Sequence, residues 1–282
     1  MEAIDLYCER TGPGLWAEPL NAVTNAAFFV SAWFVWRLAQ HSGGPDGGVR
    51  MLLGLMIAIG IGSSLFHTFA NAATRALDVL PIALFVLAYL WLYCRKIIGI
   101  RPIPSAGLLS VVALAIYFGR QFPHLLNGLL TYAPALLVVV GLGLVHMLQA
   151  RRALYDLLAA ASVFVIALSC RTIDNAVCAG FPLGTHFLWH VLSALAFYLA
   201  MRAVIANLSQ AERDEIAITQ SYMPKQLSED EANAAVAETI ASLGATTVKD
   251  MGKVMAELKA RYAGQMDMAK AGAAVKSMLG KP

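Results

Sequence analysis

Residues 51–70 read MLLGLMIAIGIGSSLFHTFA, twenty positions without an Asp, Glu, Lys or Arg. A helix needs about 20 apolar residues to cross a bilayer. The stretch is therefore predicted to be a membrane-spanning helix. Its last turns carry Ser63 and His67, two polar groups in an otherwise apolar segment.

Six more apolar stretches of comparable length surround this one. They lie at about 20–40, 77–95, 105–121, 127–149, 153–172 and 185–206. Backbone groups in lipid must be paired within the protein, so a helix bundle is the expected architecture. We predict an all-α fold, namely a seven-transmembrane helix bundle followed by a small soluble helical domain.

The second domain is predicted from a change in composition. The chain of 282 residues has a mean hydropathy of +0.63, but residues 1–207 hold 20 charged side chains while the much shorter 208–282 holds 19. All five Trp lie in the first part. In the second, Ser228-Glu229-Asp230-Glu231 has the pattern of a capping box at a helix start. We therefore predict two domains, 1–207 in the membrane and 208–282 in water.

Basic residues predict the orientation of the bundle. Four Lys or Arg flank the predicted spans on the N-terminal side and eight flank them on the other. The richer side is expected to be cytoplasmic. We therefore expect an integral, multi-pass protein of a bacterial inner membrane, with its N-terminus outside and the 208–282 tail in the cytoplasm.

Polar side chains of the spans gather at one depth, at the ends nearest the N-terminus. Ionisable residues inside a membrane are costly and usually functional. The gathered residues are Ser63, His67, Asp78, Asp174, His186 and His190. Asp174 is expected to pair with Arg171 at its helix end. His41, His124 and His146 lack such neighbours, and we assign them no function.

The histidine spacing predicts a metal site. His186 and His190 are four residues apart, so both imidazoles share one helix face. Together with His67 they supply three ligands, and three His with a water form an open, catalytic kind of zinc site. Asp78 is suited to act on the water or orient a His, and Ser63 to stabilise an oxyanion. The alternative is an interhelical hydrogen-bond network without metal.

In this order, the motifs resemble the alkaline ceramidase family, whose wider superfamily includes the adiponectin receptors. The likeness spans about residues 4–203 and rests on Ser63-x3-His67, Asp78, His186-x3-His190, Cys8-Glu9 and Trp16-Ala17-Glu18-Pro19-Leu20-Asn21. The resemblance implies a seven-helix fold and zinc held by His67, His186 and His190. It also implies hydrolysis of ceramide to a sphingoid base and a fatty acid. Asp78 would act on the zinc water and Ser63 on the oxyanion.

Two further features are implied by the resemblance. The family's calcium site corresponds to Asp5, Glu9 and Glu18, and oxygen ligands suit this ion. The spacing departs from the family pattern and Arg10 follows Glu9, so a solvated acidic leader is the alternative. Cys8 and Cys178 match a disulfide pair, on the side where oxidation is possible. Cys94 is expected to be a free thiol, and Cys170 a buried residue that behaves as a small apolar side chain.

The tail resembles another family. Tyr222-Met223-Pro224-Lys225-Gln226-Leu227-Ser228-Glu229 and residues 249–255 resemble the C-terminal domain of the GatB/YqeY family. A helix running from the seventh span through 202–210 would join it to the bundle. Because a lipid hydrolase has no evident use for this module, we hypothesise an engineered fusion, with a natural fusion as the alternative.

The sequence thus predicts a zinc-dependent amidohydrolase that acts on linear lipid amides such as ceramide or a related N-acyl lipid. The competing hypothesis is a seven-helix receptor-like or transport protein with a structural zinc. Asp78 and Ser63 favour the enzyme, because a structural zinc site usually fills all four positions with protein. Nucleic-acid binding is not expected of the membrane domain.

Overall fold

The computed structural model describes residues 4–222 and 227–280, and for 209–222 it describes the backbone only. The described part of the chain contains helices but no strand. The chain divides into two compact units, Met1–Glu212 and Arg213–Pro282. The predicted fold class, a bundle of apolar helices followed by a small helical region, is confirmed. Residues 223–226 of the predicted tail motif lie outside the described residues.

The described α-helices of the first unit are α1 (Pro19–Thr24), α2 (Ala26–His41), α3 (Gly47–Phe69), α4 (Ala72–Leu92), α5 (Pro102–Gly119), α6 (Ala133–Leu148), α7 (Asp156–Val177) and α8 (His186–Tyr222). A π-helix, η1 (Tyr93–Ile98), extends α4, and a 3-10 helix, η2 (Leu125–Thr131), precedes α6. Six segments of the described chain can cross a membrane by length and composition, or seven if η2 and α6 form one bent span. The chain is therefore a multi-pass membrane protein.

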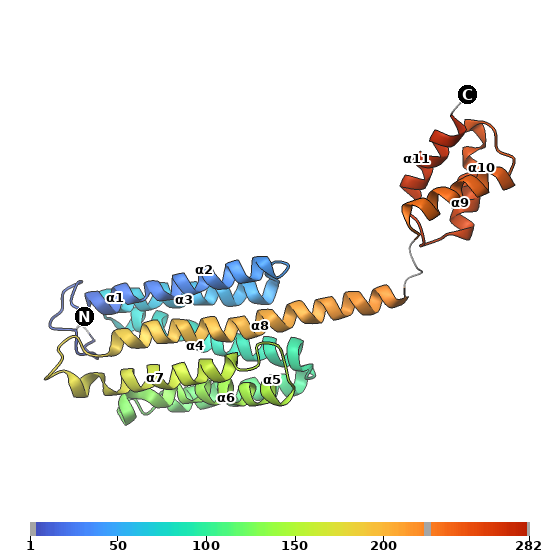
Figure 1. Cartoon of the computed structure of the whole chain (residues 1–282). Helices are drawn as coiled ribbons and strands as arrows, with labels where there is room; N and C mark the ends of the chain where they lie inside the picture. Colours follow the sequence, from blue (N-terminus) through green and yellow to red (C-terminus); the bar gives the residue numbers. More distant parts are fainter. Residues whose placement is uncertain (1–3, 223–226, 281–282) are drawn as a thin grey trace. The chain divides into compact units, whose positions relative to one another are not determined.

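The site lies at one end of this bundle. In Figure 1 the N-terminal segment and the loop between α7 and α8 are at the same end, where α4 begins and α3 finishes. A disulfide between Cys8 and Cys178 joins the N-terminal segment to this loop. Cys94 is a free thiol, as expected, whereas Cys170 is free but only partly buried.

Helices α3 and α4 lie very close to each other at Gly62. A Cβ atom added there would lie 2.0 Å from the carbonyl oxygen of Leu77. That carbonyl is not used within α4, because its helical partner would be Pro81, which has no N–H. The absence of a side chain at Gly62 therefore lets the two backbones meet, beside Ser63 on one helix and Asp78 on the other.

Polar groups at the other end of the bundle are paired with one another. Asp156 accepts hydrogen bonds from Nε and Nη2 of Arg202. His146, which is fully buried, lies between the Tyr93 hydroxyl and the carbonyl of Arg152. We assigned His146 no function, and these contacts give it a structural role. His41 and His124 are exposed.

The second unit contains α9 (Glu229–Ser242), η3 (Val248–Asp250), α10 (Met251–Arg261) and α11 (Met268–Leu279). Its own core is formed around Val236, Val254, Leu258 and Val275, none of which exposes more than 1% of its surface. The predicted capping box at Ser228 and Glu231 is confirmed by both of its hydrogen bonds. The predicted continuation of the last span is also confirmed, since α8 is one helix to Tyr222.

Candidate active site

Three histidines from two helices converge at the predicted depth. His67 comes from the end of α3, and His186 and His190 from the first turns of α8. One ring nitrogen of each lies within 4.8 Å of the others, and all three residues are at least 98% buried. Among the described residues, His67 Nε2, His186 Nδ1 and His190 Nε2 have no hydrogen-bond partner. Buried nitrogens without partners are costly, and a shared metal ion would satisfy them.

The opposite nitrogens of two rings are held by the N-terminal segment. His67 Nδ1 is 2.5 Å from a carboxylate oxygen of Glu18, and His190 Nδ1 is 3.0 Å from the hydroxyl of Thr24. A metal-binding His normally donates its second N–H to such a partner, which fixes the ring and its tautomer. When Nδ1 carries the proton, Nε2 of each ring keeps a free lone pair, and both Nε2 atoms belong to the converging group. These contacts fit a metal better than a metal-free hydrogen-bond network.

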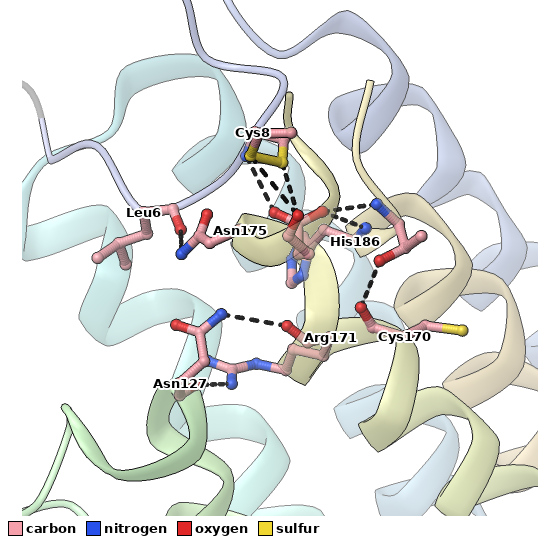
Figure 2. Close-up of a disulfide and its surroundings, with 10 residues drawn as sticks. Leu6, Cys8, Asn127, Cys170, Arg171, Asn175 and His186 are labelled. Atoms are coloured by element: carbon pink, nitrogen blue, oxygen red, sulfur yellow. Dashed lines mark hydrogen bonds between the residues drawn. A yellow bond between two sulfur atoms is a disulfide. The ribbon is translucent and has the colours of Figure 1, made fainter. Parts of the chain in front are cut away.

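His186 is positioned by different contacts. Its ring stacks on Tyr7, with centroids 3.5 Å apart. Its backbone N–H and that of Thr185 donate to one oxygen of Asp174, at 2.8 and 2.6 Å. Asp174 is fully buried, and its other oxygen accepts the N–H of Cys8 at 2.9 Å. Figure 2 shows Cys8 with its disulfide, and His186, in this region.

The expected pair of Asp174 with Arg171 is wrong. Asp174 caps the start of α8 instead, where unpaired N–H groups and the helix dipole favour a negative charge. Arg171 donates to the carbonyl of Asn127, and Asn127 donates back to the carbonyl of Arg171, as Figure 2 shows. Its guanidinium lies 5.0 Å from the Tyr132 ring centroid and 5.9 Å from that of Trp189.

Ser63 and Asp78 lie beside the histidines. Ser63 is 3% exposed and is one helical turn before His67. The half-buried carboxylate of Asp78 is within hydrogen-bond reach of Ser63 and within electrostatic reach of His67. The structure therefore brings together all five residues that were predicted for catalysis and zinc binding.

The candidate calcium residues do not form a ligand group. Asp5 is exposed, and Glu9 accepts the N–H groups of Leu20 and Asn21 at the start of α1, at 2.6 and 2.8 Å. Glu18 is held by His67 and by Arg10, whose Nε is 2.5 Å from a carboxylate oxygen. A side-chain cation thus already neutralises Glu18, and we do not carry the calcium prediction forward.

Arg10 hydrogen-bonds to several groups of this segment. Besides Glu18, it donates to the carbonyls of His67, at 3.1 Å, and Gly12, at 3.2 Å. Burial on its own would raise the pKa of Glu18. Hydrogen bonds from His67, Arg10 and Asn21 nevertheless hold that pKa below its usual value. Glu18 is therefore a carboxylate at neutral pH, which is the form that accepts a hydrogen bond from His67.

Two cavities are lined by neighbours of the histidines, although not by the histidines themselves. A polar cavity of about 380 Å³ is lined by Asp78, Tyr7, Tyr132, Arg75, Arg120 and Arg171. An apolar cavity within the bundle is lined by residues that include Ile82, Phe85, Phe164, Trp189, Ser193 and Phe197. Helix α4 lines the polar cavity with its first turns and the apolar cavity with its later turns. The surroundings of the site are therefore polar and charged on one side and apolar on the other.

Sequence reasoning missed the residues that hold the histidines. Glu18 was assigned to calcium, and Thr24, Tyr7 and Arg10 were given no role. A signal was available, because Glu18 and Thr24 flank the start of the first span at the same depth as the predicted ligands. Buried polar groups there need partners, and the histidines were the nearest polar groups expected in that layer.

Comparison with known proteins is consistent with this geometry. Residues 7–229 match the family model described as Ceramidase, and that match covers most of the chain. Residues 193–279 match the family model described as Yqey-like protein. No curated protein matches the chain.

Proposed function

This chain belongs to the ceramidase family, and on that premise we propose that it hydrolyses the amide bond of a membrane lipid with a bound zinc ion. The observation that carries the proposal is the group of three buried histidines whose converging nitrogens have no partner among the described residues. Asp78 and Ser63 beside them supply an acid–base group and a hydroxyl. The apolar cavity supports a lipid as the substrate.

The ligands and their support follow from the contacts. His67, His186 and His190 would hold the ion, while Glu18 and Thr24 keep two of the rings in the required tautomer. When bound, zinc polarises a carbonyl and lowers the pKa of water to about 7. Only three protein ligands gather in the described part of the chain, which favours a catalytic over a structural site.

The remaining chemistry belongs to the side chains. Asp78 accepts a proton from the attacking water and delivers it to the amide nitrogen. The Ser63 hydroxyl holds Asp78 in place and, when turned to the substrate, donates to the oxygen that gains negative charge. The C–N bond breaks, and the products are a fatty acid and an amine. We propose that this occurs at the outer face of the membrane, as the distribution of basic residues predicts.

Metal analysis of the detergent-purified full chain tests the proposal. We expect about one zinc per chain in the wild type and loss of most of it in His190→Ala, together with loss of fatty-acid release from N-acyl lipids. His124→Ala is the matched control, because His124 is exposed and outside the site. A wild-type protein that hydrolyses lipid amides equally well before and after chelation would contradict the zinc mechanism.

A further inference from the structure

Three arginines line the polar cavity beside the site. Arg75 is in the first turn of α4, Arg120 follows the end of α5, and Arg171 comes from α7. Asp78 is the cavity's one carboxylate among the described lining residues. All four charged groups lie within electrostatic reach of the Tyr132 hydroxyl. The cavity therefore has an excess of positive charge at a site that the proposed reaction uses.

These arginines outnumber the one acidic group in the cavity, Asp78, which lies within electrostatic reach of Arg75 and Arg171. None of the three forms an ion pair among the described residues. Arg171 is more than nine-tenths buried, and its Nε has no hydrogen-bond partner there. Arg75 and Arg120 are exposed. Three arginines against one carboxylate leave a net positive charge in the cavity, so a complementary anion would stabilise it.

Each of the two cavities would hold a different end of a substrate. Tyr7 and Asp78 connect the polar cavity to the histidines, since Tyr7 stacks on His186 and Asp78 lies within electrostatic reach of His67. Trp189 and Ser193, on either side of His190 in sequence, line the apolar cavity. With an acyl chain in the apolar cavity, the amine side of the amide lies toward the arginines.

We propose that the arginine cavity, formed by Arg75, Arg120 and Arg171, binds an anionic group on the amine side of the lipid amide. The preferred substrates are then N-acyl lipids with a phosphate or carboxylate headgroup rather than neutral ceramide. A cavity of about 380 Å³ is large enough for such a headgroup. The inference rests on the proposed amidase function. The same arginines offer equivalent chemistry to bulk anionic phospholipid, which the test must separate.

A matched pair of probes tests the inference. N-dodecanoylethanolamine phosphate and neutral N-dodecanoylethanolamine differ in one anionic group. Hydrolysis of both is followed as dodecanoate release by the full chain in a non-ionic detergent. Binding of both is measured by native mass spectrometry after chelation, so that it does not depend on turnover. Arg75→Gln and Arg120→Gln are compared with Arg101→Gln, an exposed arginine outside the cavity.

We expect wild type to prefer the phosphate probe by about tenfold or more in binding and in kcat/KM. Each cavity variant should reduce that preference by weakening the phosphate probe alone, and Arg101→Gln should not. Equal use of both probes by wild type, or equal loss of both in the variants, would overturn the inference. Phosphatidylglycerol that displaces the phosphate probe at equal concentration would also overturn it. Preferential binding without hydrolysis would instead reject the proposed function and leave the anion subsite standing.

Discussion

At the scale of single residues, the geometry of the three histidines depends on the side chains behind them. Glu18 and Thr24 hold two histidine rings, and Asp174 holds the backbone from which the third projects. Glu18 is itself held by Arg10, which also binds the carbonyl of His67. The three free nitrogens converge because each ring is fixed from behind.

Glu18→Gln is expected to weaken zinc binding by roughly 10–100-fold, because the amide no longer supplies a charged acceptor for the His67 N–H. The zinc dissociation constant can be measured by competition with a chelator. Glu9→Gln is the matched control, since Glu9 is buried in the same segment but contacts only the start of α1. An equal loss in both variants would mean that Glu18 acts through the segment rather than through His67.

Sequence spacing could predict the three candidate histidine ligands, but not the residues that hydrogen-bond to them. The spacing of His186 and His190 places them on one helix face. His67, Ser63 and Asp78 could be added because they lie at the same depth in their predicted membrane spans. The contact of Glu18 with His67 joins residues 49 positions apart and depends on how the N-terminal segment folds back. Asp174 was misassigned because the nearby Arg171 offered a charge, whereas the unpaired N–H groups of α8 compete better for it.

At the scale of elements, the register of α3 against α4 positions the reacting groups. Gly62 and the free carbonyl of Leu77 set how close the two backbones come. Gly62→Ala must therefore push the helices apart, at an expected cost of about 1–3 kcal/mol in stability. Because Ser63 and Asp78 move with their helices, amidase activity should fall by on the order of 10²-fold.

Thermal unfolding in detergent and the rate of fatty-acid release measure the two effects. Gly54→Ala is the control within α3, since a Cβ there meets no atom within 4 Å. That variant should be as stable as wild type or slightly more stable, because Ala favours helix over Gly. If Gly62→Ala behaved like Gly54→Ala, the close approach would not govern the site.

Apolar length predicted the spans well, but not their breaks. The stretch 127–149 was expected to be one helix, whereas η2 and α6 meet at a bend of 50°. Leu126, Asn127 and Gly128 have positive φ, which interrupts the helix there. Asn-Gly is a turn signal, and an average over apolar residues conceals it. The bend matters, because Asn127 then reaches the backbone of Arg171.

At the scale of the whole molecule, the chain combines two units with separate cores. The first is organised around buried histidines and apolar helices, and the second around Val254 and Leu258. The change in charge density predicted a boundary after residue 207, and the two compact units divide after Glu212. A natural fusion and an engineered one would have the same packing. Our hypothesis of an engineered tail therefore stays a prediction that genomic sequence can test.

We expect the full chain to unfold in two thermal transitions, since each unit has its own core. Chelation should lower only the transition of the first unit, because the proposed metal ligands all belong to it. Leu258→Ala should lower only the transition of the second unit, because Leu258 is fully buried in its core. The expected loss in the free energy of unfolding of that unit is about 2–5 kcal/mol. Scanning calorimetry of the detergent-solubilised wild type, with and without chelator, and of the variant separates these effects. If either treatment moved both transitions together, the two units would be energetically coupled, and the tail would contribute to the stability of the site.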